Sequence, residues 1–200
     1  MYLLESLKKT AEEVTGVGKP SAQAVRESVR GRKPHTALFR DDGSIPNNPE
    51  LPFVHYRSPV RFPDGTDPAA LFEELFKRNA WQDSWRNGIY DYVHYHSRIH
   101  EVLGVARGHA RVRFGGNKGR VFKLRVGDVV ILPAGTGHQS LSASKDLLVV
   151  GAYPTSGTYD ECTGLAKEHE QAFRSIGKVP LPKKDPVYGG KGPLLELWRH

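Results

Sequence analysis

The chain has 200 residues, of which 38% are hydrophobic and 26% are charged, and its formal net charge is +7. This length and composition are typical of one soluble globular domain. No apolar run approaches the roughly 20 residues that cross a bilayer, and the N-terminus has no signal-peptide pattern. The basic residues are scattered, so we expect a solvated basic surface rather than a nucleic-acid or membrane partner. The single cysteine, Cys162, excludes an internal disulfide and favours a cytoplasmic location.

Residues 1–35 differ from the rest of the chain and are expected to form an N-terminal extension that is helical or loosely ordered. Leu3, Leu4 and Leu7 lie near helical spacing in the segment YLLESLKK, and the segment GVGKP is expected to end this helix. Ser21 is a candidate N-cap for a second, weak helix. The extension is basic, which would suit docking on a partner subunit or an anion. It also has few large apolar residues, which would suit a loosely packed extension.

The next segment, up to Ala80, contains two short strands and one clear helix. TALF and FVHYR are the predicted strands, and a long turn, DDGSIPNNPELP, separates them. In DPAALFEELFKRNA, Asp67 is a good N-cap and Pro68 fits the first helical position. The large apolar residues of this segment recur on one face, which predicts a helix packed against a core: Leu71, Phe72, Leu75 and Phe76.

From Gly88 to Pro154 the sequence breaks into short strands separated by glycine-containing turns. HARVRFG and VFKLRV alternate between apolar and polar residues, whereas GDVVILP and DLLVVGAYP are largely apolar. This pattern predicts an all-β sandwich or barrel. We therefore expect one domain over residues 36–200, with its barrel core near 88–154 and a few peripheral helices. The turn-rich C-terminal tail is expected to dock on this domain through its apolar residues, Leu194, Leu195, Leu197 and Trp198.

Residues 94–101 read HYHSRIHE and hold three of the nine histidines in the chain. In a strand, alternate side chains share a face, so His94 and His96 point the same way and can chelate one ion. Glu101 lies far enough along the chain to bring its carboxylate back toward them. His138 follows a strand and a turn, and it can supply a ligand from a neighbouring strand. Taken alone, a pair of histidines at this spacing also fits a polar surface strand.

Two groups of residues have the order and spacing of a known pair of motifs: first Gly88, His94, His96, Glu101 and Gly108, then Gly127, Pro133, Gly135 and His138. Together they resemble the signature of the cupin family. The resemblance implies a small antiparallel β-barrel, a jelly roll, in which His94, His96, Glu101 and His138 bind a metal. Ser142 departs from the pattern, because the second motif often has Asn there. That Asn is not a usual metal ligand, so the departure affects local hydrogen bonding more than the metal site.

The resemblance extends beyond the motifs to a group of bacterial single-domain cupins of unassigned function. It covers roughly Leu38 to Trp198 and leaves the N-terminal extension uncovered. This likeness supports the fold and the site but says little about the reaction.

Three imidazoles and one carboxylate suit one divalent transition metal per chain, whether Fe, Mn, Ni, Co, Cu or Zn. An ion with six ligands would keep two positions open for water, dioxygen or a substrate, whereas four-coordinate zinc would make a closed, structural site. We expect catalysis, with Tyr90 and Tyr92 as catalytic residues on the side of the histidines. His100 either orients Glu101 or lies on the surface. Cys162 has no evident base partner and is expected to pack rather than react.

The sequence is compatible with three functions. The first is a metal-dependent dioxygenase or other oxidoreductase that acts on a small organic molecule. The second is a metal-dependent isomerase or lyase acting on a sugar or organic acid, and the third is a non-catalytic module that binds a small molecule. The basic net charge favours an anionic ligand, such as a small carboxylate or an enediol. The single motif pair predicts one barrel per chain, and we expect a homodimer to which TALF and the N-terminal extension contribute.

Overall fold

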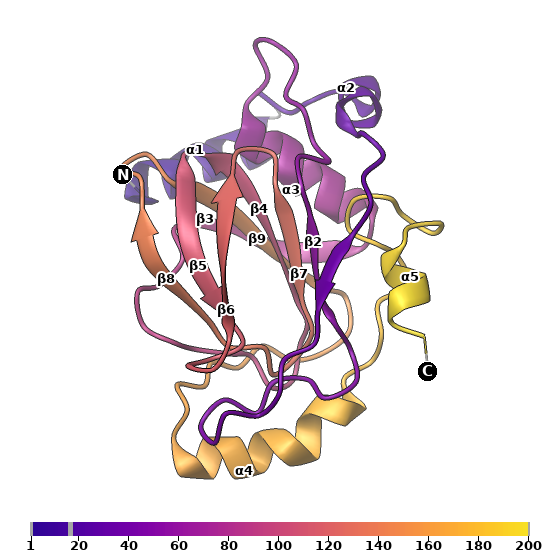
Figure 1. The fold of residues 1–200 in the computed structure, drawn as a ribbon. Helices are drawn as coiled ribbons and strands as arrows, with labels where there is room; N and C mark the ends of the chain where they lie inside the picture. The colour runs from indigo at the N-terminus through magenta and orange to yellow at the C-terminus, as the bar shows by residue number, and fades with distance from the viewer. Residues whose placement is uncertain (1, 16–17, 200) are drawn as a thin grey trace.

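The computed structural model describes residues 2–15 and 18–199. Its strands form two antiparallel sheets that face each other as a jelly-roll barrel, with helices around it (Figure 1). The larger sheet has the strand order β1 (His35–Ala37), β2 (Phe53–Tyr56), β7 (Val129–Leu132), β4 (Glu101–Arg107), β9 (Leu148–Pro154) and β3 (Trp81–Asn87). The smaller sheet has the order β6 (Arg120–Arg125), β5 (His109–Phe114) and β8 (His138–Ala143). The expected all-β fold with peripheral helices is therefore confirmed.

The core between the two sheets explains why β5 and β6 alternate in sequence. Val112 and Phe114 of β5 point inward and meet Phe53 and Val130 of the larger sheet. The rings of Phe53 and Phe114 lie 4.6 Å apart, centre to centre. Arg111, between the inward-facing residues of β5, is exposed on the outer surface. The smaller sheet thus has one face buried in the core and one face exposed to solvent, as the alternating pattern predicts.

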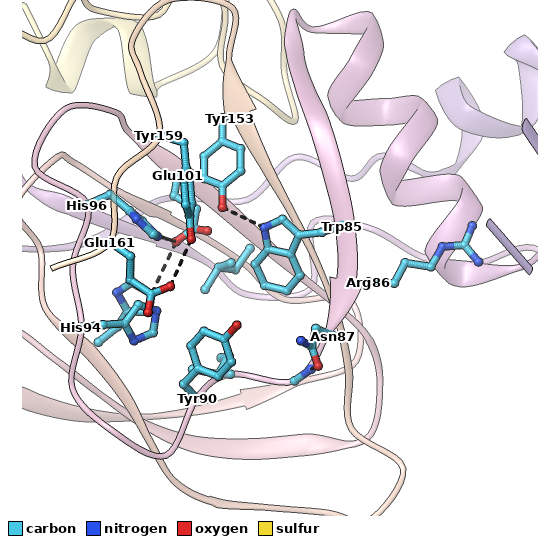
Figure 2. Close-up of a pocket in the computed structure, with 14 residues that line it drawn as sticks. Trp85, Arg86, Asn87, Tyr90, His94, His96, Glu101, Tyr153, Tyr159 and Glu161 are labelled. Carbon is cyan, nitrogen blue, oxygen red and sulfur yellow. Dashed lines mark hydrogen bonds and ion pairs between the residues drawn. The ribbon is translucent and has the colours of Figure 1, made fainter. Parts of the chain in front are cut away.

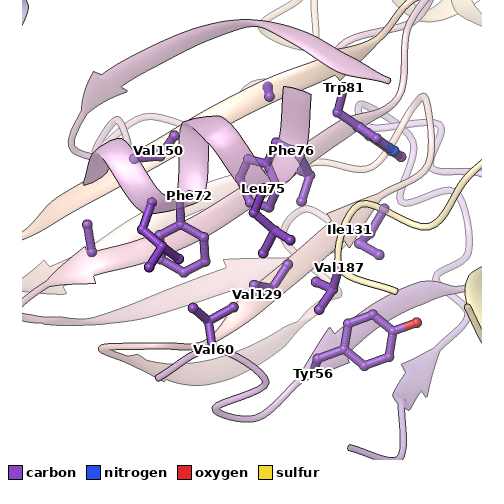
Figure 3. Packing of buried hydrophobic residues seen from close by; sticks show 14 of the residues in the cluster. Tyr56, Val60, Phe72, Leu75, Phe76, Trp81, Val129, Ile131, Val150 and Val187 are labelled. Atoms are coloured by element: carbon purple, nitrogen blue, oxygen red, sulfur yellow. The ribbon is translucent and has the colours of Figure 1, made fainter. Parts of the chain in front are cut away.

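The larger sheet is covered on its second face by α3 (Pro68–Arg78), which explains the largely apolar strands β7 and β9. Phe72, Leu75 and Phe76 of α3 pack onto Val129 and Ile131 of β7 and onto further buried apolar residues (Figure 3). The helix begins as expected, because the Asp67 side chain accepts a hydrogen bond from the Ala69 N–H at 2.9 Å. A Cβ on Gly104 of β4 would lie 2.7 Å from the Phe72 ring, so glycine permits this close packing.

Further helices in the described part of the chain lie around the barrel (Figure 1): α1 (Tyr2–Thr15), α2 (Ala22–Ser28), α4 (Ala166–Ser175) and α5 (Leu194–Leu197). A short 3₁₀ helix (Ile176–Lys178) follows α4. Ser21 caps α2 as predicted, accepting a hydrogen bond from the Ala24 N–H. The expected end of the first helix, at Gly16 and Val17, lies outside the described residues. Within the described ranges, no helix has the length and apolar character needed to cross a membrane.

Helix α1 lies along β3 and forms several ionic contacts with the domain. Glu5 pairs with Arg107 and lies 3.7 Å from the Nη1 of Arg86, and Lys8 lies 2.6 Å from Asp67. Its leucines at positions 3, 4 and 7 are exposed. The tail also docks: Leu194 and Trp198 are buried, Leu195 and Leu197 are half-buried, and the Trp198 indole donates to the Pro52 carbonyl at 2.8 Å.

Two features differ from the predicted layout. The larger sheet extends beyond the core expected near residues 88–154, because β1, β2 and β3 all precede Gly88. Residues 88–100, where strand alternation was expected to place His94 and His96 on one face, form no regular strand. Two isolated bridges join this stretch to other segments, His94 to His138 and Tyr95 to Cys162, and further main-chain hydrogen bonds link Tyr90 to Ser140 and His96 to Gly135. Neither bridge extends into a ladder, so this segment can bend around the site it carries.

Candidate metal centre

Three buried histidines converge at one end of the barrel. His94 and His96 lie on the irregular segment before β4, and His138 is the first residue of β8. The backbones of His94 and His138 exchange two hydrogen bonds, of 3.2 and 2.9 Å, which fixes the two segments beside each other. One ligand nitrogen from each histidine lies within 4.8 Å of the others. The geometry therefore brings together three of the residues that the motifs predict as ligands.

The Nδ1 atom of each imidazole contacts a main-chain carbonyl oxygen. The Nδ1 of His94 lies 3.4 Å from the Tyr92 carbonyl oxygen, and the Nδ1 of His138 lies 3.2 Å from that of Thr136. The Nδ1 of His96 contacts the carbonyl oxygen of Asp160. A carbonyl can only accept, so these contacts place a proton on Nδ1, and in the neutral imidazole Nε2 then has a free lone pair. This is the arrangement that prepares a histidine to bind a metal through Nε2.

Glu101, at the start of β4, directs its carboxylate toward the histidines (Figure 2). Its Oε2 lies 3.5 Å from the Nε2 of His96 and 3.5 Å from the Nε2 of His138. The same oxygen is buried and has no hydrogen-bond partner among the described residues. A buried carboxylate oxygen without a partner is costly, and a cation at this position would remove the cost. Three imidazoles and this oxygen fit a divalent transition metal.

Burial and mutual charge set the protonation of the three histidines. Burial lowers the pKa of His94, and burial together with the two neighbouring imidazoles lowers that of His138 well below its usual value. Burial also acts to lower the pKa of His96, but the charge of Glu101 and the Asp160 carbonyl outweigh it and raise the value to about 9. Metal binding would thus require His96 to lose a proton, since only neutral imidazole binds a metal.

A cavity of about 330 Å³ opens beside the three histidines. Its walls are largely aromatic, with Trp85 from β3 and Tyr153 from β9, and with Tyr90 and Tyr159 nearer the surface (Figure 2). The Trp85 indole donates to the Tyr153 hydroxyl at 3.0 Å. Burial, and next the charge of Glu101, raise the pKa of Tyr153, so this hydroxyl stays protonated beside the carboxylate.

Of the two tyrosines expected to be catalytic, Tyr90 lines the cavity and Tyr92 does not. Their rings stack, with centres 4.9 Å apart, and both are partly exposed. The Tyr92 hydroxyl donates to Oε1 of Glu161 at 2.9 Å. Tyr159 donates to Oε2 of the same residue at 3.1 Å. Desolvation and the hydrogen bond to Glu161 raise the pKa of Tyr92 to about 12.

Glu161 belongs to a segment that crosses the mouth of the site, residues 155–164, which we call the strap. Asp160 fastens it: its carboxylate accepts hydrogen bonds from the Ser97 N–H at 2.9 Å, the Ser97 hydroxyl at 2.6 Å and the Arg98 N–H at 3.2 Å. On either side of Asp160, Tyr159 and Glu161 line the cavity. The motifs end at His138, and no local sequence pattern indicated that the strap would return to the site.

The remaining candidates lie away from the cavity. His100 is fully buried, and its Nδ1 accepts a hydrogen bond from the Ala134 N–H at 2.9 Å. Its ring packs against Trp198 instead of lying on the surface. Cys162 is also buried, and burial followed by the charge of Asp160 raises the pKa of its thiol to about 11. A thiol with a raised pKa is a poor nucleophile, in agreement with a packing role.

The sequence is similar to those of known proteins. The cupin family model matches residues 85–178. The uncharacterized protein YjlB of Bacillus subtilis (strain 168) is 42% identical over 167 residues, a match that covers 84% of this chain and 98% of that protein.

Solved structures give weaker matches. An uncharacterized conserved protein with a double-stranded beta-helix domain from Klebsiella pneumoniae is 15% identical, with a TM-score of 0.34, over 70% of this chain and 94% of that one. An oxalate decarboxylase variant from Bacillus subtilis is 20% identical, with a TM-score of 0.35, over 68% of this chain. The match spans only 35% of that decarboxylase.

Proposed function

The chain belongs to the cupin family, and on that premise we propose that it is an enzyme that depends on one divalent transition metal per chain. We propose that it acts on a small organic molecule by dioxygenase or other oxidoreductase chemistry. His94, His96, Glu101 and His138 would hold the ion. The candidate ions are Fe, Mn, Ni, Co, Cu and Zn, and metal analysis of the purified protein identifies the one that is bound.

One observation carries this proposal: three imidazoles with their Nδ1 atoms on main-chain carbonyls meet a buried carboxylate oxygen that has no hydrogen-bond partner among the described residues. The strong β core and the covering helix α3 give the fold enough buried apolar surface without a metal. A cavity lies beside the histidines, which a purely structural ion would not need. These features together favour a catalytic ion over a structural one.

A bound divalent ion would supply Lewis-acid or redox chemistry at the floor of the cavity. The chain's own residues would then bind and orient the substrate. Tyr90 offers a hydroxyl at the cavity wall, and Glu161, held between the hydroxyls of Tyr92 and Tyr159, offers a carboxylate that can accept a proton from a substrate hydroxyl. In this arrangement Tyr90 is the catalytic tyrosine, and Tyr92 acts through Glu161 as a positioning residue.

A second candidate function is that of a metal-dependent isomerase or lyase. Glu161 favours it, because a carboxylate at the cavity wall can move a proton between neighbouring carbon or oxygen atoms of a substrate without dioxygen. Both candidates use the same ion and the same residues, and they differ in whether dioxygen is consumed.

The test begins with the metal content of protein purified without added metal. Protein loaded with that metal is then screened against small hydroxy, keto and carboxylate compounds while dissolved oxygen and products are measured. Oxygen uptake coupled to product supports the dioxygenase type, and product formed under nitrogen supports the isomerase or lyase. Tyr92→Phe should lower turnover more than metal binding, whereas Tyr188→Phe, far from the cavity, should change neither. A metal-loaded protein whose Co(II) spectrum responds to no small ligand would contradict the enzyme proposal.

A further inference from the structure

The cavity contains less positive charge than the net charge of the chain suggests. Among the described residues that line it, Arg86 is the sole arginine and there is no lysine. The guanidinium of Arg86 is fully buried and points away from the histidines, toward α3 (Figure 2). It donates two hydrogen bonds to Glu73, at 2.9 and 2.7 Å, and lies 3.6 Å from Asp67. Arg86 is therefore committed to the packing of α1 and α3 and cannot turn to bind a ligand.

The cavity does contain negative charge. Glu101 lies at its floor, and Glu161 lies near its mouth between two phenol hydroxyls that both donate to it. The two carboxylates offset the two charges of a divalent ion, so an incoming anion would meet no surplus positive charge. It would also approach the carboxylate of Glu161, an exposed residue, and like charges repel each other.

The walls suit a flat or ring-shaped molecule. Trp85, Tyr90, Tyr153 and Tyr159 present aromatic surface, and Ile89 and Leu103 add apolar contact. Glu161 and Asn87 lie on opposite sides of this aromatic space (Figure 2). Glu161 can accept a hydrogen bond from a ligand hydroxyl, and a volume of about 330 Å³ accommodates a single small ring with its substituents.

We propose that the ligand of this cavity is an electrically neutral ring that carries two adjacent oxygen atoms, at least one of them a hydroxyl. This inference rests on the proposed function, because the oxygen pair would face the metal while the ring lies between the aromatic walls and a hydroxyl meets Glu161. It departs from the anionic ligand that the net charge of +7 favours. Such a ring is either alicyclic, as in a carbohydrate, or phenolic.

The experiment compares size-matched neutral and anionic rings on Co(II)-loaded protein. The alicyclic pair is cis-1,2-cyclohexanediol and cyclohexanecarboxylate, and the phenolic pair is catechol and benzoate. Binding is followed by the Co(II) absorption spectrum and, independently, by tryptophan fluorescence, since Trp85 lines the cavity. We expect the neutral member of at least one pair to bind about tenfold more tightly than its anionic partner. The pair with the larger preference identifies the ring type.

Glu161→Gln gives the decisive comparison. It keeps an acceptor oxygen for one of the two tyrosine hydroxyls but removes the charge, so carboxylates should bind about tenfold more tightly than to the wild type. Glu170→Gln is the matched control, because Glu170 is an exposed carboxylate that pairs with Arg174 on α4 and should leave both rankings unchanged. Carboxylates that bind the wild type more tightly than both diols, or a Glu161→Gln variant with unchanged ranking, would overturn the inference.

The metal content of each sample is measured before any ligand is added. A protein that takes up no Co(II) contradicts the proposed function at that step. The fluorescence titration still ranks the neutral and anionic rings in the same sample, so the two failures are distinguishable.

Discussion

The Nδ1 of His96 contacts the main-chain carbonyl oxygen of Asp160, a residue 64 positions further along the chain. This contact joins a residue of the first motif to the strap that crosses the cavity mouth. The Asp160 carboxylate fastens the strap to the backbone of Ser97 and Arg98, directly after His96. The orientation of the imidazole and the position of Glu161 above the site therefore depend on the same residue.

Asp160→Ala should weaken metal binding although Asp160 is not expected to be a ligand. Without the carboxylate, the strap loses its hydrogen bonds to Ser97 and Arg98, and the carbonyl that orients His96 is free to move. Loss of such an orienting partner typically lowers metal affinity by about 10–100-fold. A competition titration of Co(II) against a chelator measures the change. Asp64→Ala, at an exposed loop position, is the control. Equal affinities in the two variants would mean that the strap does not orient His96.

The four proposed ligands predict a graded loss of metal on substitution. His94→Ala and His138→Ala should each retain little metal after purification, because each removes one imidazole from a set of three. Glu101→Gln should also bind less tightly, since it replaces a charged oxygen with a neutral one. His109→Ala, at an exposed position on β5, should bind one ion per chain like the wild type. Elemental analysis of the four proteins checks this. Equal metal in all of them would place the ion elsewhere.

The parts of the fold that alternate or contain a strong cap could be predicted from sequence. Asp67 and Pro68 indicated α3, and the pattern in HARVRFG indicated β5, because each element buries one regular face. Strand β3 was not predicted, because a register shift between Gln82 and Trp85 breaks its alternation. Helix α4 was not predicted either, since Ala172 is its one buried residue among those described.

The same contrast applies to the site. His94, His96 and His138 lie in motifs with fixed spacing, so the sequence was enough to nominate them. Asp160 and Glu161 reach the cavity through long-range contacts with the segment that carries the first motif. Such contacts leave no periodic trace in the sequence, and only the folded chain reveals them.

His100 should make the metal-free protein sensitive to acid. Burial lowers the pKa of His100 to about 3. Its Nδ1 already accepts a hydrogen bond from the Ala134 N–H, so a proton added to Nδ1 would point at that N–H and break the bond. The unfolded chain takes up a proton below about pH 6.5, whereas the folded chain does not until about pH 3. The stability that His100 contributes is therefore fully present above pH 6.5 and is lost as the pH falls toward 3. At a pH of about 5 the loss is about 2 kcal/mol.

Urea unfolding at a pH of about 7.5 and about 5 measures this effect. His100→Asn keeps an acceptor for the Ala134 N–H but cannot titrate in this range. The variant will be less stable at neutral pH because its contact with the Trp198 ring is reduced. Between the two pH values, however, it should lose about 2 kcal/mol less than the wild type. The exposed His109→Asn variant should lose as much stability between the two pH values as the wild type does. If His100→Asn also loses as much as the wild type, His100 is not the group that takes up a proton on unfolding.

The exposed leucines of α1 bear on the predicted homodimer. Leu3, Leu4 and Leu7 are 75%, 71% and 59% exposed, whereas Glu5 and Lys8 tie the helix to its own domain. Strand β1 lies at the edge of the larger sheet, and Leu38 beside it is also exposed. Clustered apolar side chains on a helix that is already anchored are typical of a surface covered by a partner.

We expect light scattering at micromolar protein to give the mass of a dimer. Leu4→Glu should shift the mass toward the monomer, because dimerisation would bury its charge without a partner. Leu165→Glu makes the same change at a leucine that is 63% exposed near α4, and this variant should stay dimeric. A monomer mass for the wild type would contradict the dimer, and a dimeric Leu4→Glu protein would place the interface away from α1.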